Sequence, residues 1–576
     1  MSRKASLYLY QNTTVTVGDV SESLPARTVL ASKRDGAFGS LLSSCKPGDA
    51  ERWVWLAYDQ LHLDFLHELS EQTSLGVVLI ESREKAARRP YHQQKLGVVL
   101  SNQRHFALEL QEAGIPVLYL MSAFSTAEVL AALHPLLGCL EAFEHAEHAL
   151  RKETEPLVKA GLLNLHPHPG WLTSRDCFVE SVGTEPPFRM DKFYRKVRQS
   201  TTWLMEDGKP LGGKYSFDAE NRFPWKGEPA APVAPLFPRD AIDEEVEELV
   251  QTTFGDHPGV VDLSKQATSR DDVEMALRHA LECLPHFGTY EDAMSEQSRG
   301  LFHSRLATLV NLHRLMPRRL MNAVLESNAP LNSIEGFVRQ MIWREYVRHI
   351  HEVTDGFRTL DLHRTPSKRG ARWAGHEAED VETHANHLSQ TNPLPQAYWG
   401  VKSGLRCLDA SVESVMEEGW THHIPRLMVL SNVANLIDVN PRELTDWFHA
   451  AFIDAYDWVV EPNVLGMGTF ALGTAMMTKP YVAGSAYINR MSDHCGACQF
   501  HHKKTCPMTR LYWAYLNRHK ASFTGNHRMA IAMKNVERRA VEEKQLDEAT
   551  FEHVRDQLLS GRELRPPQQG DLRMWS

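Results

Sequence analysis

Three cysteines close together near the C-terminal end most constrain what this chain can fold into. They stand in Met491-Ser-Asp-His-Cys-Gly-Ala-Cys498 and Thr505-Cys506-Pro507, so Cys495, Cys498 and Cys506 fall within twelve residues of a chain with eight cysteines in all. Thiolates at C-x2-C spacing bind soft metals, because two sulfurs on one tight turn can reach one ion or cluster. Cys407, far upstream, is a candidate for the fourth ligand.

The spacing does not decide which metal is bound. Zinc and a four-iron cluster both accept four cysteines, and a Cys-Pro ending is common in iron–sulfur runs. His494, His501 and His502 keep a zinc ribbon open. Reduced, buried thiols without a metal are the alternative, but they do not explain the clustering. Cysteines with this spacing indicate a reducing, cytoplasmic compartment and not a disulfide framework.

Charge and hydropathy exclude several classes of protein. The formal net charge is −10 over 576 residues, so a nucleic-acid site would have to be a local basic patch. The N-terminus lacks the apolar core of a signal peptide, and no run of about 18 apolar residues predicts a membrane span. We expect a cytoplasmic monomer of two to four domains.

Short apolar runs alternate with helical segments in the first third of the chain. The runs are 53–58, 76–80 and 114–120, and the segments lie around 91–112 and 125–137. This alternation predicts an α/β domain with a parallel sheet over residues 52–178. No G-x-G-x-x-G or Walker motif is present. Residues 1–51 are polar and weakly patterned, and we assign this extension no role.

Prolines and glycines over residues 179–240 predict a long interdomain linker. An all-α domain is predicted over 241–535, followed by a solvated C-terminal helix and tail over 536–576. Its amphipathic segments are 242–250, 271–284, 299–314, 333–351 and 441–458.

Residues 354–392 read as an insertion in the helical domain. Arg364, Lys368, Arg369 and Arg372 are mixed there with Asp, Glu and His. A solvated loop is the favoured interpretation, and an added nucleic-acid contact is the sharper alternative.

Several long motifs occur in a fixed order along these domains. Asp59-Gln-Leu61 follows the first predicted strand, and the others are 212–222, 335–345, 421–428 and 480–495. Together with the domain order they resemble the iron–sulfur bacterial cryptochromes and photolyases, also called prokaryotic (6-4) photolyases. The resemblance covers roughly residues 52–535. It implies a photolyase-like fold with an antenna-type α/β domain and a helical FAD-binding domain.

The resemblance also implies two cofactors. A 4Fe-4S cluster would be held by Cys407, Cys495, Cys498 and Cys506, although only residues 499–505 separate the last two, a shorter loop than the family leads one to expect. FAD needs no phosphate loop, because Arg, Ser and helix N-termini can hold a pyrophosphate. The implied FAD contacts are His303, Ser304, Arg305, Arg339, Gln340, Trp343, Arg344 and Asp454.

Photochemistry needs a route for electrons into the flavin. The matching positions are Trp447, next to the flavin, and Trp399, further out. Without the resemblance, both would read as core residues. Phe448 stands where relatives carry tyrosine, so one branch of electron hopping is expected to be missing. Asp454 would face the reactive flavin nitrogen.

Repair of a (6-4) photoproduct needs a proton donor, and histidine suits the task because its pKa lies near operating pH. His422 and His423 match the family's histidine pair, with His423 as donor and His422 as positioning residue. Val460 stands where relatives place a carboxylate, which weakens the transfer of repair activity. The other implied residues are Tyr481 and Asp292 at the lesion pocket and Asp218 and Arg222 at the DNA.

A lumazine antenna, 6,7-dimethyl-8-ribityllumazine, is carried by many members of the family. Glu81 is retained here and Val99 matches an apolar contact, but Lys85 stands where an acidic contact is expected. The resemblance therefore allows an antenna and leaves its identity open.

Three functions compete at this point. The first is light-driven repair of (6-4) photoproducts in UV-damaged DNA. The second is a blue-light photoreceptor with the same cofactors, acting through a protein partner. The third is a zinc-stabilised nucleic-acid-binding module without photochemistry, which would be colourless.

Overall fold

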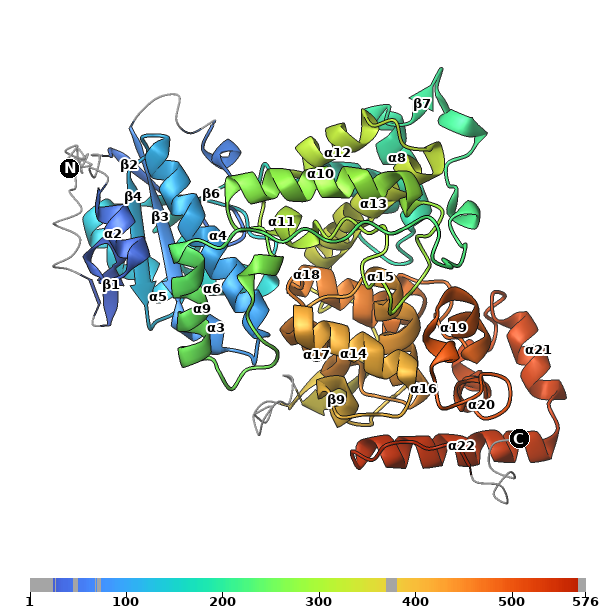
Figure 1. Ribbon diagram of the computed structural model, residues 1–576. Coiled ribbons are helices and arrows are strands. Elements are labelled where there is room, and N and C mark those ends of the chain that lie inside the picture. The colour runs from blue at the N-terminus through green and yellow to red at the C-terminus, as the bar shows by residue number, and fades with distance from the viewer. Residues whose placement is uncertain are drawn as a thin grey trace, which may run out of the picture.

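The computed structural model describes residues 24–25, 27–44, 50–67, 69, 74–368 and 381–567. An α/β domain lies beside a larger helical domain, and extended segments of the chain cross between them (Figure 1). None of the described helices is both long and apolar enough to span a membrane.

The sheet of the α/β domain has the order β1-β4-β3-β2-β5-β6, and β2 to β6 are parallel. Strands β3 and β4 are almost entirely buried, as expected for parallel strands covered on both faces. The predicted parallel α/β domain is confirmed. Its elements are β2 (Arg52–Trp55), β3 (Leu75–Ser82), α3 (Arg83–Ala87), α4 (Gln93–Glu112), β4 (Val117–Ser122), α5 (Thr126–Leu137), β5 (Leu140–Phe143), α6 (His148–Lys159) and β6 (Leu163–His166).

The N-terminal extension contributes to this domain, which the sequence did not predict. β1 (Thr28–Leu30) pairs antiparallel with the edge strand β4. α2 (Ala37–Ser44) buries Phe38 edge-on against Tyr119, with ring centroids 4.8 Å apart. A three-residue strand is too short to show a periodic pattern, so its signal is absent from the sequence.

The predicted linker is partly helical. α7 (Arg175–Val182) and α8 (Met190–Thr201) precede a short hairpin of β7 (Met205–Glu206) and β8 (Lys209–Pro210). The face of α8 that carries Phe193 and Val197 is buried, and the Tyr194 hydroxyl donates to Glu335 at 2.7 Å. The predicted linker therefore includes a packed helix over residues 190–201.

Two of the predicted amphipathic segments are not single helices. Segment 299–314 holds only a short helix, because Leu301 and Arg305 adopt positive φ angles of 44° and 57°. Segment 441–458 is broken into two helices. The helices are α10 (Arg270–Phe287), α11 (Ala307–Asn311), α12 (Pro317–Leu325), α13 (Leu331–Val353), α14 (Arg406–Glu418), α15 (His423–Pro425), α16 (Asn432–Leu436), α17 (Pro441–Ala451), α18 (Asp457–Val460), α19 (Ser485–Met491) and α20 (Met508–Arg518), with π-helical turns at Arg426–Ser431 and Glu461–Gly468.

Helix α9 (Ala241–Thr253) packs against α4, so it lies on the α/β domain (Figure 1). The helical domain thus begins after the predicted boundary at residue 241. A capping box between Asp240 and Asp243 fixes the start of α9.

Within the predicted solvated loop at 354–392, β9 (Arg364–Lys368) and β10 (Val381–Ala385) pair antiparallel and lie against α17. Arg364 donates to the carbonyl oxygens of Phe357 and Leu360, so its charge stabilises the fold locally. Arg369 and Arg372 lie outside the described residues.

The C-terminal helix is solvated on only one face. After α21 (Ala530–Arg538), α22 (Val541–Leu559) packs on α20 and buries Phe551, Val554 and Leu558. Arg518 of α20 lies 3.4 Å from the centroid of the Phe551 ring.

Candidate active site

One large cavity in the helical domain gathers most of the predicted cofactor residues; we call it the central cavity. Gln340, Trp343, Arg344 and Val347 come from one face of α13, because their spacing follows the helical repeat. The segment before α11 turns its side chains inward through the positive φ of Arg305. Of the predicted FAD contacts, the lining includes His303, Ser304, Arg305, Gln340, Trp343, Arg344 and Asp454.

Arg339 is the predicted contact that does not line the cavity. Its guanidinium is paired with Glu291 at 2.9 Å and with Glu335 at 3.4 Å. Arg339 therefore lies behind the residues that line the central cavity.

Three histidines meet at the wall of the central cavity. The rings of His303 and His422 are stacked with centroids 4.0 Å apart, and His423 lies edge-on to His303 at 5.3 Å. Within the described chain, Nε2 of His303 and Nδ1 of His422 are buried without a hydrogen-bond partner. These two nitrogens are available to a bound group.

Burial determines the protonation states of these three histidines. It lowers the pKa of His303 and His422 well below the ordinary value, and neighbouring histidines add to the effect. The pKa of His423 is also lowered by desolvation, but Glu291 opposes this, with Oε1 at 3.9 Å from Nε2. His423 keeps 40% of its side chain exposed. It is therefore the member of the group best placed to exchange a proton with a bound molecule.

Glu291 is a site residue that the sequence did not identify. Its buried carboxylate accepts from Asn221 at 2.8 Å, Arg339 at 2.9 Å and Gln340 at 2.6 Å. It joins the linker, α13 and His423. In the sequence, only the neighbouring residue Asp292, a predicted lesion contact, pointed to this position.

The predicted lesion and DNA residues form a second group outside the cavity lining. Arg222 pairs with Asp218 and lies 3.9 Å from Asp292. Burial, and then the charge of Glu291, raises the pKa of Asp292 to about 6. Tyr481 is 38% exposed, and burial and Asp218 raise its pKa. The structure thus brings all four residues together.

Asp454 lines the central cavity, and an ion pair with Arg426 holds its side chain in place. The two side chains form a bidentate pair with distances of 3.0 and 2.9 Å. Arg426 also lines the cavity and lies 4.3 Å from the Phe452 ring centroid. Arg426 was not predicted as a site residue, although it belongs to the motif at 421–428.

The two predicted electron-transfer tryptophans are in contact. The Trp447 and Trp399 rings lie edge to face with centroids 6.4 Å apart, and Trp447 donates Nε1–H to the Tyr398 carbonyl at 2.9 Å. Neither ring lines the central cavity. Phe452 lies between Trp447, at 5.6 Å, and Arg426 in the cavity wall.

The four predicted metal ligands converge at the start of α14. Burial, and then the charges of Cys506, Cys495 and Cys498, raises the pKa of Cys407 well above the ordinary value, so the four sulfurs face one another. Burial raises the pKa of Cys506 to about 12 and that of Cys495 to about 11. Among the described residues, no three of these sulfurs lie within 4.8 Å of one another.

The short loop between Cys498 and Cys506 folds back tightly. The His501 carbonyl accepts from the amides of Lys504, Thr505 and Cys506 at 3.0 to 3.1 Å. The Phe500 amide donates to Cys498 Sγ at 3.4 Å. Its reduced length therefore does not prevent Cys506 from returning to the other cysteines.

A further cavity lies between the α/β domain and the helical domain. It is lined by the predicted antenna residues Glu81, Lys85 and Val99. Lys85 is paired with Glu147 at 2.7 Å. Burial lowers the pKa of Lys95 in the same wall to about 7.

The architecture defines a class of protein: a parallel α/β domain joined to a helical domain with a central cofactor cavity, as in photolyases. Residues 54–265 match the family described as deoxyribodipyrimidine photo-lyase-related protein, and residues 337–502 match the FAD binding domain of DNA photolyase. A class III photolyase from Agrobacterium tumefaciens has a similar structure, with a TM-score of 0.52 and 14% identity over 89% of this chain and 98% of that one.

A curated relative identifies the family more closely. The chain is 33% identical to the (6-4) photolyase of Agrobacterium fabrum over 476 residues, which is 79% of this chain and 89% of that protein. A shorter match, 39% identical over 66 residues, links 12% of the chain to 54% of an uncharacterised mimivirus protein, R855. The chain belongs to the iron–sulfur bacterial cryptochrome and photolyase family.

Proposed function

We propose that this chain repairs (6-4) photoproducts in DNA by light-driven electron transfer from reduced FAD. The observation that carries the proposal is the histidine group of the central cavity, in which His423 is exposed to the cavity and supported by Glu291. The relative named (6-4) photolyase supports the choice of lesion. We propose that the protein acts in the cytoplasm as a monomer.

The residues of the central cavity fit FAD. Arg305 and Arg344 bring positive charge to the wall, where a pyrophosphate can be held. The unpartnered nitrogens of His303 and His422 can each form a hydrogen bond with a bound polar group. When bound and reduced, FAD supplies the electron on absorbing light.

His423 is the proposed proton donor, and His422 positions it. Glu291 stabilises the protonated imidazole, which burial would otherwise disfavour. The buried, stacked His422 holds the orientation of the pair. The lesion reaches these residues only when it is flipped out of the duplex, at a cost of a few kcal/mol.

The second group contacts the flipped lesion and the DNA backbone around it. Tyr481 and Asp292 are proposed to lie against the lesion, and the half-exposed Arg222 to bind a phosphate. Asp218 orients Arg222 through their ion pair.

The four cysteines are proposed to hold a 4Fe-4S cluster. The similarity to the (6-4) photolyase of Agrobacterium fabrum, and with it membership of the iron–sulfur family, supports iron over zinc at these four thiols. Bound iron would keep the thiols deprotonated despite their raised pKa values.

Trp447 and Trp399 are the proposed route by which electrons reach the flavin. The cavity lined by Glu81, Lys85 and Val99 is the proposed antenna site, and lumazine is one candidate for its occupant.

A photoreceptor without repair activity is the second candidate. Val460 is buried in the core, and the next residue, Glu461, is paired with Arg442 and His351. Neither residue lines the central cavity. The position at which the family places a carboxylate is therefore apolar and buried here, and the neighbouring Glu461 is held in ion pairs away from the cavity.

Illumination of the reduced protein with damaged oligonucleotides distinguishes the candidates. We expect light-dependent restoration of an oligonucleotide that carries a (6-4) photoproduct and none of one that carries a cyclobutane dimer. A flavin-loaded, iron-loaded protein that restores neither would favour the photoreceptor. A colourless protein without flavin would favour the zinc-stabilised module.

A further inference from the structure

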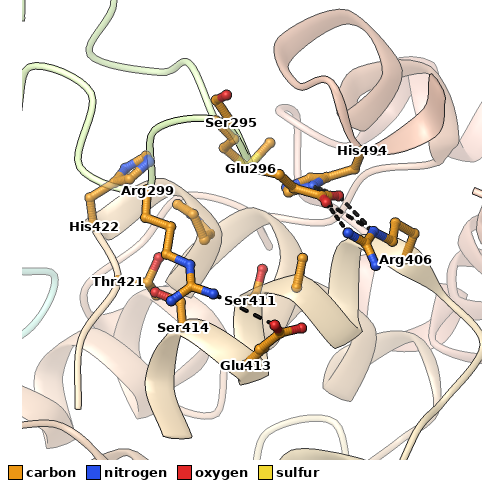
Figure 2. Close-up of a pocket in the computed structure, with 13 residues that line it drawn as sticks. Ser295, Glu296, Arg299, Arg406, Ser411, Glu413, Ser414, Thr421, His422 and His494 are labelled. Atoms are coloured by element: carbon orange, nitrogen blue, oxygen red, sulfur yellow. Dashed lines mark hydrogen bonds and ion pairs between the residues drawn. The ribbon is translucent and has the colours of Figure 1, made fainter. Parts of the chain in front are cut away.

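A second, polar cavity shares His422 with the central cavity and is lined by the residues that directly precede Cys407 and Cys495; Figure 2 shows its charged side chains. Glu296 is the centre of a junction there. Arg406 Nε donates to both Glu296 carboxylate oxygens at 2.9 Å, and His494 Nδ1 donates to Oε1 at 2.9 Å. Arg406 directly precedes Cys407, and His494 directly precedes Cys495. One carboxylate thus connects the two chain segments that carry these cysteines.

The backbone around Glu296 is fixed on the same segment. The Met294 amide donates to the Met491 carbonyl at 2.8 Å. The Ser295 hydroxyl and the Glu296 amide donate to the Asp493 carboxylate at 2.6 and 3.0 Å. Glu296 therefore cannot follow a movement of His494 without moving its own segment.

The segment that begins at Glu296 leads directly into the central cavity. It runs along α14, where Arg299 pairs with Glu417 at 2.5 Å and Glu418 at 3.1 Å. Arg305, which lines the central cavity, pairs with the same Glu418 at 2.5 Å. Ion pairs thus join residues 296–305 to both ends of α14, whose second residue is Cys407.

We propose that Glu296 is a positioning residue that couples the cysteine cluster to the flavin cavity. The cluster fixes the start of α14 and the turn at Cys495, and Glu296 transmits this position to the segment that carries His303, Ser304 and Arg305. The proposal rests on the proposed function, because it requires iron at the cysteines and FAD in the central cavity.

The strength of the junction comes from burial as well as charge. His494 is only 6% exposed and the Glu296 side chain 23% exposed, so solvent screens the contact between them less than a surface pair. A glutamine at 296 keeps the shape of the side chain but removes its charge, which leaves the fold intact and weakens the junction.

The test compares Glu296→Gln with the parent protein and with Glu413→Gln. Glu413 lines the same cavity, but its two ion pairs, with Arg299 and Lys402, are both 3.7 Å long, and among the described residues it makes no hydrogen bond with Arg406 or His494. We expect Glu296→Gln to speed both the release of iron to a ferrous chelator and the dissociation of FAD, each by roughly tenfold if one charged hydrogen bond is lost. Glu413→Gln should change neither rate.

The reduction potential of the cluster is a second readout, and it distinguishes a positioning role of Glu296 from a general loss of stability in the variant. Removal of a negative charge beside the cluster favours its reduced form, so Glu296→Gln should shift the cluster's reduction potential to a more positive value. Glu296→Asp, which keeps the charge, should restore the potential. If Glu296→Gln proves insoluble, Arg406→Lys removes one arm of the junction at a side chain that is 42% exposed and should show the same paired rates.

Two results would overturn the coupling alone: unchanged rates in Glu296→Gln, or faster iron release with unchanged FAD dissociation. A parent protein that contains neither iron nor flavin would overturn the proposed function together with the coupling. The iron and flavin contents of the parent therefore distinguish the two failures.

Discussion

The proton chemistry of the central cavity depends on how three neighbouring histidines differ in their surroundings. His303 and His422 are buried and stacked, and burial keeps them neutral. His423 is partly exposed and has Glu291 beside it. A pair of adjacent histidines in sequence cannot reveal this difference, because Glu291 is 132 residues upstream of His423 and reaches it only through the fold.

Replacement of Glu291 should change the pH dependence of repair. Glu291 raises the pKa of His423 against desolvation, so Glu291→Gln should lower that pKa. The protonated fraction then falls at neutral pH, and the alkaline limb of the repair rate should move to lower pH. The measurement is the single-turnover repair rate against pH, with the exposed Glu326→Gln as control. An unmoved alkaline limb would exclude this role of Glu291.

At the scale of elements, the sequence predicted which side chains share the central cavity better than it predicted where helices begin and end. The motif residues on α13 and at the start of α15 do line one cavity, because helical spacing fixes which of their side chains share a face. The segment 299–314 was predicted as one helix, since its apolar spacing fits one. Positive φ angles at Leu301 and Arg305 override that pattern, and only the packed structure can impose them.

The contact between Trp447 of α17 and Trp399 of the turn Gln396–Trp399 offers a test at this scale. Trp447→Phe should strongly slow photoreduction of the flavin, since phenylalanine is hard to oxidise and Trp399 would lose its partner. The substitution also leaves the Tyr398 carbonyl without its donor, at a cost of about 1–3 kcal/mol in stability. Transient absorption measures the rate, and Trp513→Phe, on α20, is the control. Photoreduction at the parent rate would rule out this route.

At the scale of the whole molecule, many histidines are buried neutral. Burial lowers the pKa of His92 and His148 to about 4 and that of His145, His313 and His349 to about 3. The unfolded chain binds protons at these positions near pH 6.5, before the folded protein does. Stability is therefore present above about pH 6.5 and is lost as pH falls toward these lower values.

Acid should therefore unfold the protein steeply between about pH 6.5 and about pH 4. A histidine whose pKa falls by about two units contributes up to about 3 kcal/mol to this loss. Asp59 acts in the opposite direction, because burial raises its pKa to about 7. Denaturant unfolding at a series of pH values measures the free energy of unfolding. A constant value between pH 7 and 5 would disagree with this expectation.

The domain order was predictable from alternating and amphipathic patterns, but the way the ends of the chain join the core was not. β1 adds three residues to the sheet edge by pairing with β4, and α22 packs on α20 through Phe551, Val554 and Leu558. Both contacts depend on which other element the fold brings alongside. The convergence of Cys407 with the C-terminal cysteines is likewise a result of the fold, although their spacing and the family resemblance named them.

The most direct test of the central claim compares the parent protein with His423→Asn in the (6-4) repair assay under single-turnover conditions. Asparagine keeps a hydrogen-bonding side chain but cannot donate a proton as an acid. We predict that the variant binds the damaged oligonucleotide and photoreduces its flavin as the parent does, yet restores no lesion under light. Repair by His423→Asn at the parent rate would contradict the assignment of the proton donor and the mechanism built on it.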